Sequence, residues 1–288
     1  MKTHLNSVFV TGASTGIGAA CVHRLAASGT PVFAGVRNAA DGDRLRADYA
    51  SLITPVIIDV TDIASIAAAA QTLTDALGDS GLGGLVNNAG IAIAAPLEVL
   101  PLDQLRRQFE VNVFGALAVT QACLPLLRRA RGRIVNIGSI AGRIALPIIG
   151  AYSMSKFALG AMTHAMRLEL DAAGIDVTVV EPGAIATPIW KKSGDAADAL
   201  EARLAHPALP YYRAHLESFR AVTGEAERHA VSADAVARAV EHALTSKRPR
   251  THYLVGRDAK LRAALAAVLP QGALDTLHRW VLKVPRRH

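Results

Sequence analysis

The chain has 288 residues, of which 51% are hydrophobic and 19% are charged, and this composition excludes an intrinsically disordered protein. The formal net charge of +7 permits contact with nucleic acid or an acidic membrane, but no nucleic-acid motif accompanies it, so we expect no nucleic-acid partner. Cys21 and Cys123 lack metal-ligand spacing, and the histidines form no ligand cluster, so we predict buried thiols and no metal.

Short β-branched runs alternate along the chain with longer stretches of helical periodicity. The runs that we read as strands are 7–11, 31–36, 55–60, 83–88, 132–138, 176–182 and 251–256. The stretches that we read as helices are 16–29, 62–77, 101–130, 151–174 and 232–245. Repeated strand and helix predict an α/β protein with a Rossmann-like, doubly wound fold, in which a seven-stranded parallel sheet carries helices on both faces.

No linker composition divides the chain, so we predict a single catalytic domain over residues 1–255. Within it, residues 183–231 lack a strand and contain Pro188, Pro207 and Pro210, which predicts a substrate lid with short helices. Residues 256–288 form a basic, amphipathic C-terminal extension. Since no apolar run reaches the length of a membrane span and no signal peptide is recognisable, we expect a cytoplasmic protein.

The segment "VTGASTGIG" follows the first strand and opens the first helix. Glycines allow a sharp turn and a close backbone approach, while a helix N-terminus offers unpaired N–H groups to a pyrophosphate. An ordinary tight turn is the alternative, but the position between strand and helix favours a dinucleotide site. The residues assigned to this site are Gly12, Ser14, Thr15, Gly16, Ile17 and Gly18.

The segment "AYSMSKFALG" sets Tyr152 and Lys156 one turn apart on the same face of a helix. An isolated tyrosine is a poor base at neutral pH, since its pKa is about 10. A neighbouring ammonium favours the phenolate and would make Tyr152 a usable acid and base. By itself the pair is a weak signal, because both residues are common.

These segments, with "NNAG" (87–90), Ser139 ahead of "YSMSK" and "PGAIATP" (182–188), resemble the classical short-chain dehydrogenase/reductase family, closest in character to its steroid- and retinol-type members. The resemblance runs from about Val8 to Pro188 and again through the last helix and strand. It implies an NAD(P)-dependent oxidoreductase that interconverts a carbonyl compound and its alcohol by hydride transfer. A non-catalytic NADP-binding sensor or scaffold is the alternative, disfavoured because both Tyr152 and Lys156 are present.

By this resemblance the catalytic residues are Asn112, Ser139, Tyr152 and Lys156. Tyr152 would exchange a proton with the substrate oxygen, to which Ser139 also hydrogen-bonds. Lys156 would lower the pKa of Tyr152 and hold the nicotinamide ribose. Asn112 would hold a water linked to Lys156, and its apolar flanks "FEVNVFGAL" indicate a buried amide.

The resemblance also assigns cofactor contacts further along the chain. Asp59 would accept a hydrogen bond from the adenine amino group, with a simple turn residue as the alternative. Thr187 and the backbone of Ile185 would reach the nicotinamide carboxamide, although Thr187 could instead be a helix cap. The remaining cofactor-binding residues are Val60, Asn88, Ala89, Gly90, Tyr152, Lys156, Pro182 and Gly183.

The end of the second strand decides between the two nicotinamide cofactors. A carboxylate there suits the ribose 2′-hydroxyl of NAD, whereas a cation suits the 2′-phosphate of NADP. This chain has Gly35, Val36 and Arg37 at that point, so we predict NADP(H), with NAD(H) left open. Against this, Thr15 stands where many NADP-using members have a second basic residue.

The substrate is expected to be a bulky lipophilic ketone, aldehyde or alcohol. The segment "IAGRIALPIIGAY" is almost wholly apolar, and the lid offers Trp190, Tyr211, Tyr212 and Phe219. The apolar residues of the extension could contact an anionic membrane, or could pack over the lid or a second subunit, which we favour. The long helices 101–129 and 151–173 resemble the family's association surface, so we expect a homodimer or homotetramer.

Overall fold

The computed structural model describes residues 5–187, 189 and 206–282. In this part of the chain, seven strands form one sheet in the order β3-β2-β1-β4-β5-β6-β7, and every neighbouring pair is parallel. The strands are β1 (Val8–Val10), β2 (Val32–Val36), β3 (Ile53–Ile57), β4 (Gly84–Asn87), β5 (Arg133–Ile137), β6 (Asp176–Pro182) and β7 (His252–Val255). The predicted doubly wound fold is confirmed, with its switch point between β1 and β4.

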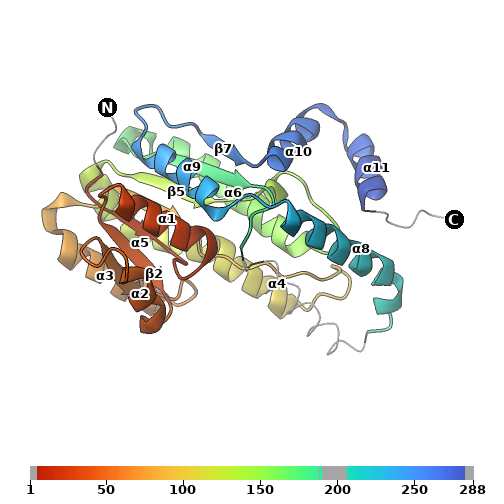
Figure 1. Cartoon of the computed structure of the whole chain (residues 1–288), viewed down its shortest axis with the longest axis horizontal. Helices are drawn as coiled ribbons and strands as arrows, with labels where there is room; N and C mark the ends of the chain where they lie inside the picture. Colours follow the sequence, from red (N-terminus) through yellow and green to blue (C-terminus); the bar gives the residue numbers. More distant parts are fainter. Residues whose placement is uncertain (1–4, 188, 190–205, 283–288) are drawn as a thin grey trace.

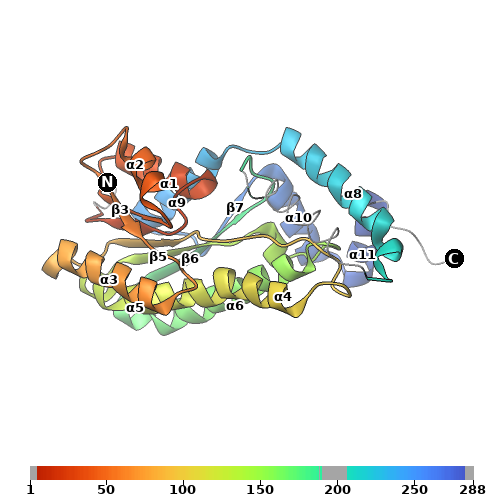
Figure 2. The same ribbon diagram turned by 90° about the horizontal axis from the view of Figure 1, so that it is seen from below.

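Helices cover both faces of the sheet (Figures 1 and 2). One face carries α1 (Gly16–Ala27), α2 (Ala39–Arg46) and α9 (Ala233–Thr245). The other carries α3 (Ile63–Leu77), α4 (Leu102–Phe109), α5 (Gly115–Ala130) and α6 (Gly150–Glu169). Three more helices lie beyond the carboxyl ends of the strands: α8 (Leu209–Arg228), α10 (Arg257–Val268) and α11 (Gln271–Val281).

The core divides into two halves because side chains alternate along each strand. Val8 and Val10 of β1 pack with Leu25 of α1 on one side of the sheet. Phe9 points the other way and packs with Leu73 of α3. Burying such a side chain stabilises the fold by about 1.5–3 kcal/mol. The strands are apolar on both faces for this reason, which is typical of a parallel sheet between helices.

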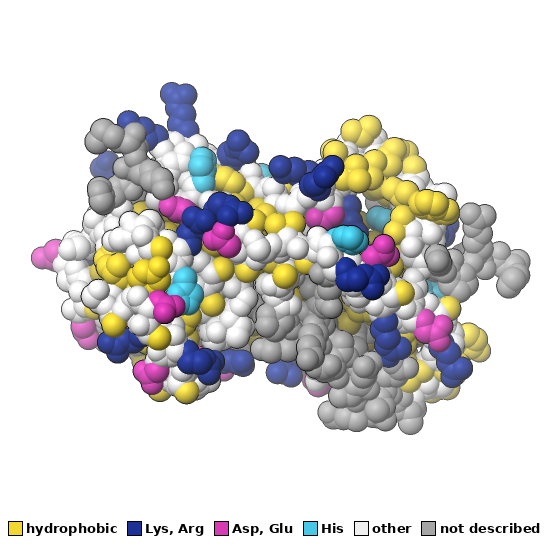
Figure 3. Space-filling view, in the orientation of Figure 1, with side chains coloured by type: hydrophobic (Ala, Val, Ile, Leu, Met, Phe, Trp, Pro, Cys, Tyr) yellow, Lys and Arg dark blue, Asp and Glu magenta, His cyan; other side chains and the backbone are white. Residues whose placement is uncertain are grey.

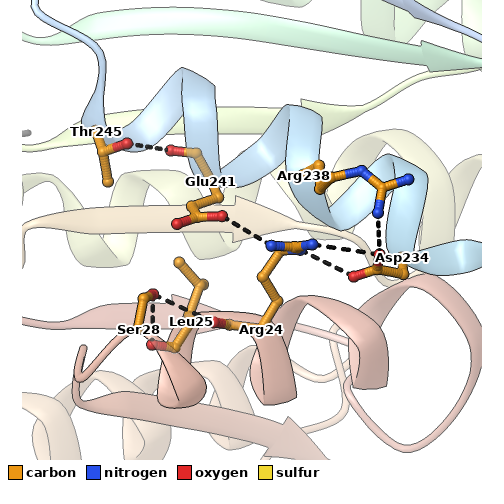
Figure 4. A network of polar contacts seen from close by, with 7 residues as sticks. All are labelled: Arg24, Leu25, Ser28, Asp234, Arg238, Glu241 and Thr245. Carbon is orange, nitrogen blue, oxygen red and sulfur yellow. Dashed lines mark hydrogen bonds and ion pairs between the residues drawn. The ribbon is translucent and has the colours of Figure 1, made fainter.

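Helices α1 and α9, far apart in sequence, lie side by side and share a polar network (Figure 4). The Arg24 guanidinium lies 2.9 Å from the carboxylate of Asp234 and 3.2 Å from that of Glu241. Arg238 also donates a hydrogen bond to Asp234. The partly exposed network joins the first and last helices that cover this face of the sheet.

The structure refines three local predictions. The helix predicted over 101–130 is one continuous helical segment, Leu102–Ala130, which contains a π turn, Glu110–Phe114, between α4 and α5. The described part of the lid holds a long helix, α8, where short helices were expected, and side chains between His215 and Ala226 of this helix line a pocket described below. Helix α2 was not predicted; Asn38 caps its start by accepting from Asp41 N at 2.9 Å.

The continuous helical segment Leu102–Ala130 is long and apolar enough for a membrane span, whereas we had read no segment of that length from the sequence. Its α5 part packs against α3 and β4, and its buried side chains, such as Leu127 and Val119, belong to the core. This is the position of a core helix in an α/β domain.

Candidate active site

The glycine turn after β1 forms one wall of a groove at the carboxyl edge of the sheet. Gly12 has φ 63°, and a Cβ there would lie 2.7 Å from Ala89 Cα, so only glycine fits. Thr15 precedes α1 in extended conformation and makes no side-chain cap, and the first turn of α1 has no acidic residue. The first N–H groups of α1 therefore remain available to an anionic ligand.

The "NNAG" turn after β4 is tied to the glycine turn by hydrogen bonds. The Asn88 amide donates to the carbonyl oxygens of Thr11 at 3.0 Å and Gly12 at 2.9 Å. The Thr11 hydroxyl accepts from the backbone N–H groups of Asn88 and Ala89, both at 3.1 Å. The Asn88 side chain thus joins two walls of the groove.

The groove has a volume of about 510 Å³, within the range of about 300–1,000 Å³ usual for ligand sites. Of the predicted cofactor residues, those that line it are Gly12, Ser14, Thr15, Gly16, Ile17, Arg37, Asp59, Val60, Asn88, Ala89, Gly90, Tyr152, Lys156, Pro182, Gly183, Ile185 and Thr187. Its size, its unsatisfied helix N-terminus and its glycine turn fit a dinucleotide.

Gly18, which we also assigned to the dinucleotide site, does not line the groove. A Cβ there would clash with the Gly12 carbonyl oxygen and would lie 2.5 Å from Asn88 Nδ2. Gly18 therefore lets α1 approach the two turns closely, a packing role. The sequence reading missed Arg107, Glu110 and Val111, which line the groove from α4 and the π turn. Their spacing of three and four residues, which places them on one helix face, was the sequence signal that could have identified them.

Arg37 and Asp59 lie at the end of the groove formed by β2 and the turn after β3. Asp59 Oδ1 accepts from the Thr61 N–H at 2.9 Å and the Thr61 hydroxyl at 2.7 Å. These bonds lower the pKa of Asp59, and the charge of Arg37 acts in the same direction. Asp59 is therefore a turn residue that also lines the groove.

Asn112 lies in the π turn, and its side-chain amide makes three hydrogen bonds with protein groups. Its Oδ1 accepts from Ile91 N at 2.9 Å, and its Nδ2 donates to Ile91 O and to Ser155 Oγ, both at 3.0 Å. Asn112 does not itself line the groove. Its amide joins the segment after β4 to helix α6.

Gln108, one turn before Asn112, adds a second fixed amide. It is fully buried, accepts from Ile93 N at 2.8 Å and donates to Ile91 O at 2.7 Å. The side-chain amides of Gln108 and Asn112 therefore hydrogen-bond to the backbone N–H and C=O groups between Ile91 and Ile93, which do not belong to a strand. The sequence indicated a buried Asn112 but not this partner.

Tyr152, Ser139 and Lys156 together form part of the wall of the groove. All three side chains are buried, Ser139 hydrogen-bonds to Tyr152, and Lys156 Nζ lies 5.7 Å from the centroid of the Tyr152 ring. Lys156 Nζ donates to the carbonyl oxygen of Ile137 at 2.7 Å. Ser155, in the same helix, donates to Tyr152 O at 2.7 Å and so extends the contacts of Asn112 to this helix.

Burial dominates the acid–base properties of this cluster. It raises the pKa of Tyr152 to about 12, against which the hydrogen bond with Ser139 acts. It lowers the pKa of Lys156 to about 8. We expected Lys156 to bring the pKa of Tyr152 below its usual value. The pKa shifts in the opposite direction, because the free-energy cost of removing a phenolate from water exceeds the stabilisation that these neighbours give it.

The residues before α6 hold a strained conformation. Ile148 has φ 71°, which is rare for a β-branched side chain, and its carbonyl oxygen accepts from Ala95 N at 2.8 Å. Ile148 is buried and belongs to the same apolar cluster as Tyr152. The strain is therefore maintained by packing and places Ile149 on the wall of the pocket described below.

An ion pair joins the turn after Ser139 to the end of β6. Arg143 follows the 3₁₀ turn η3 (Ile140–Gly142), and Nε and Nη2 of its guanidinium donate to the two carboxylate oxygens of buried Glu181, each at 2.7 Å. Nδ1 of His252 lies 2.9 Å from the same carboxylate. Because Glu181 directly precedes Pro182, this pair holds the turn that bears Ser139 against the loop that lines the groove.

A second, apolar pocket adjoins the groove and encloses about 100 Å³. Ser139, Gly183 and Ile185 line both cavities, so the two meet beside the catalytic cluster. The predicted apolar segment supplies the residues Ile140, Ala141, Ile144, Leu146, Pro147 and Ile149. Helix α8 supplies His215, Ser218, Phe219, Val222, Thr223 and Ala226.

Of the aromatic lid residues that we expected in the pocket, Trp190 lies outside the described residues, and of the other three only Phe219 lines it. Tyr211 is 81% exposed, because it lies on another face of α8. Tyr212 shares the face of Phe219 two turns away and packs against the apolar cluster of Tyr152, while its hydroxyl donates to Glu98 at 2.6 Å outside both cavities.

The C-terminal extension supplies part of the pocket wall. Asp258 and Arg262 of α10, and Leu282 after α11, line it, and the Ser218 hydroxyl donates to the Leu282 carbonyl oxygen. Asp258 also accepts from Ala184 N at 2.9 Å. The extension therefore packs against α8 of the lid, one of the two arrangements that we favoured from the sequence. The buried residues of α10 are Ala259 and Ala263, whereas Leu261 is exposed.

A groove of dinucleotide size and an apolar pocket that meet at Ser139, beside Tyr152 and Lys156, can bring a cofactor and a carbonyl compound together. The comparisons with known proteins agree with this geometry. A sequence model described as short chain dehydrogenase matches residues 6–198, more than half of the chain.

The chain is 39% identical to the 3-amino-tetrahydro-pyrrolizinone reductase of Xenorhabdus hominickii, over 93% of each sequence. It is 36% identical to retinol dehydrogenase 5 of Mus musculus, over 96% of this chain and 89% of that protein. The crystal structure of a short chain dehydrogenase from Burkholderia cenocepacia in complex with NADP superposes with a TM-score of 0.74, at 28% identity over 99% of this chain and 100% of the other.

Proposed function

Because the chain belongs to the short-chain dehydrogenase family and is an NAD(P)-dependent oxidoreductase, we propose that it interconverts a lipophilic ketone or aldehyde and its alcohol, with Tyr152 as acid and base. One observation carries the proposal: the groove and the apolar pocket share Ser139, the residue that hydrogen-bonds to Tyr152. A substrate carbonyl in the pocket would meet that pair of hydroxyl groups at the boundary.

The two hydroxyl groups have separate roles in the proposed reaction. The buried Tyr152 phenol is protonated at neutral pH, so it donates a proton to the substrate oxygen during reduction and accepts one during oxidation. Ser139 donates a hydrogen bond to the same oxygen as negative charge develops. The nicotinamide cofactor, when bound, supplies or accepts the hydride.

Lys156 and Asn112 assist Tyr152 and Ser139 in the proposed reaction. The ammonium of Lys156 lies in the same dry region and favours the tyrosinate that forms when Tyr152 gives up its proton. Asn112 does not touch the groove, so we assign it a positioning role through Ser155 and the backbone of Ile91. This differs from the role expected from the resemblance, in which it holds a water.

The pocket favours a lipophilic substrate because most of its lining is aliphatic or aromatic. Its volume of about 100 Å³ is small beside the groove of about 510 Å³, so a slim lipophilic compound fits it better than the bulky one that we expected. The reductase and retinol dehydrogenase relatives act on different compounds by their names, and neither name decides the substrate here.

We propose NADP(H) as the preferred cofactor. Arg37 lines the groove at the end of β2, where Gly35 and Val36 leave no carboxylate to repel a 2′-phosphate. Asp59 lies close enough to Arg37 for its pKa to be affected, so the local charge is mixed, and NAD(H) remains a usable substitute. An Arg37→Ala variant should lose about tenfold in kcat/KM with NADPH and little with NADH.

The test is the initial rate of NADPH and NADH oxidation with a series of linear and ring-containing ketones and aldehydes. We expect turnover of linear lipophilic compounds with NADPH, and none after Tyr152→Phe. Cofactor binding without turnover of any compound would contradict the proposed reaction, whereas a tenfold preference for NADH would contradict only the choice of cofactor.

We propose that residues 256–288 are an addition to a catalytic domain of residues 1–255 and also contact a membrane. Hydrophobic side chains gather over α10 and α11 (Figure 3). Val268 is 81% exposed and Trp280 is 74% exposed, and basic residues such as Lys260 and Arg279 lie on the same helices. Sedimentation with anionic vesicles should carry down the full chain and not a Val268→Ser, Trp280→Ser variant; equal partitioning would exclude membrane contact.

We propose self-association, as a homodimer or homotetramer, through the outer face of α5 and α6. Phe114, Met154, Phe157 and Leu168 are exposed along these helices and their junction with the π turn. Exposed apolar side chains of this size on adjacent helices favour an interface between copies. Analytical ultracentrifugation should show a species larger than the monomer that Phe157→Glu dissociates.

A further inference from the structure

The polar groups that line the apolar pocket differ in whether the protein itself satisfies them. The Ser218 hydroxyl donates to the Leu282 carbonyl oxygen, and the Thr223 hydroxyl donates to Phe219 O at 2.8 Å. The Asp258 carboxylate accepts from Ala184 N at 2.9 Å. These groups have partners and need nothing from a ligand.

Two polar groups of the lining remain without partners. Nδ1 of His215 is buried and makes no hydrogen bond. Arg262 has no hydrogen bond or ion pair with any residue of the described part of the chain, although it is partly buried. Leaving a buried polar atom or a half-buried cation unpaired is costly, so both groups would gain from a hydrogen-bonding ligand in the pocket.

Arg262 lies on the side of the pocket formed by the extension. On α10 it follows Asp258 by one turn, about 6 Å along the axis. Burial lowers the pKa of His278 on α11, and the charge of Arg262 acts in the same direction, so its field reaches that neighbouring helix. Arg262 from α10 and His215 from α8 therefore line the same pocket, which Ser139 lines beside the catalytic cluster.

Given the proposed oxidoreductase function, we propose that the pocket takes lipophilic carbonyl compounds or alcohols whose far end carries a carboxylate, and that Arg262 and His215 bind that carboxylate. A planar guanidinium matches a carboxylate with two parallel hydrogen bonds. His215, in the tautomer protonated at Nδ1, donates a further hydrogen bond to the same group. The aliphatic walls between the two ends hold the chain of the substrate.

Binding is tested without turnover. Isothermal titration calorimetry of the full chain with bound NADP⁺ would compare octanoate with octanamide, which have the same length and differ in charge. We expect octanoate to bind about tenfold or more tightly than octanamide, and Arg262→Gln to remove the difference. Lys260→Gln is the matched control, since Lys260 is an exposed cation of the same helix that does not line the pocket.

Equal affinities for the two ligands, or a preference unchanged by Arg262→Gln, would overturn the proposal. A preference lost in both variants would also contradict it, because it would reflect the general charge of α10. A His215→Phe variant tests the contribution of His215 separately from that of Arg262. It should lower the affinity for octanoate severalfold, with little effect on the affinity for octanamide.

Turnover distinguishes this proposal from the function on which it rests. An oxo fatty acid and its methyl ester would be compared with NADPH as reductant. We expect the acid to have a KM about tenfold lower than the ester, and Arg262→Gln to raise only the KM of the acid. If octanoate binds as expected and neither compound is reduced, the proposed oxidoreductase function fails and the carboxylate site stands.

Discussion

The two cavities of the site are built in different ways. The cofactor groove is formed largely by turns that follow neighbouring strands, and hydrogen bonds between side chains and backbone, such as those between Asn88 and Thr11, join these turns. The substrate pocket consists of side chains from η3, α8, α10 and the end of α11, which are far apart in sequence. The groove therefore depends on local geometry, and the pocket on how distant segments pack.

The largest expected effect is the loss of kcat when the Tyr152 hydroxyl is removed, which tests the chemical step separately from the structure of either cavity. Tyr152→Phe removes only a hydroxyl, so kcat should fall about 10³-fold, the usual contribution of a positioned acid or base, while the dissociation constant of NADPH stays the same. Tyr212→Phe is the control, because that hydroxyl bonds to Glu98 outside both cavities, and its kcat should change less than threefold or so. A large loss of NADPH affinity in Tyr152→Phe would show that the groove is not independent of the catalytic cluster.

A substitution in the glycine turn should reveal how rigid the groove is. Gly12→Ala meets the Ala89 backbone and takes an unfavourable positive φ, so we expect a loss of about 3 kcal/mol in the free energy of unfolding. Gly29→Ala has a similar φ, 80°, with no atom within 4 Å of the added carbon, and should cost only about 1 kcal/mol.

Gly183→Ala extends this comparison to the boundary with the pocket. The added carbon would meet the Asp258 carboxylate, which is the end of a side chain and can rotate away. We therefore expect a smaller loss than for Gly12→Ala, measured by urea denaturation. If all three glycine variants were equally stable, close backbone approach would not distinguish the two cavities.

The pH dependence of stability tests the burial of Lys156. Its pKa falls from 10.5 to about 8 in the folded chain, so between these values the unfolded chain binds more protons and stability rises with pH. Relative to Lys156→Met, the wild type should gain about 2 kcal/mol between pH 8 and pH 10. Chemical denaturation at both pH values checks this, and other groups cancel in the difference. Parallel curves for the two proteins would mean that Lys156 is solvated.

The smallest effect concerns the contact that joins the extension to the groove. Asp258→Ala leaves Ala184 N without its acceptor and should lower the free energy of unfolding by about 1 kcal/mol. The KM for substrate should rise severalfold, since α10 also forms the pocket wall. Asp258→Asn keeps an acceptor oxygen and should behave almost as the wild type in steady-state kinetics and thermal unfolding. An unchanged KM in Asp258→Ala would show that α10 is only loosely coupled to the site.

The catalytic cluster shows how far the sequence reading reached. The spacing of Tyr152 and Lys156 on one face of α6 could be predicted, because helix geometry alone decides it. The pKa directions could not be predicted, because they depend on burial by other elements. Asn112 was expected to be buried, but its partners Ile91 and Ser155 come from the segment after β4 and from α6.

By itself the sequence determined the sheet, its order of strand and helix, and the turns of the groove. Parallel strands bring all their following turns to one edge, so local motifs assemble there without further information. Only the tertiary structure decided the π turn, the single long helix α8, the inward face of α10 and the approach of Arg262 to the pocket. Each of these depends on which apolar face finds a partner across the molecule, and side-chain periodicity does not specify that partner.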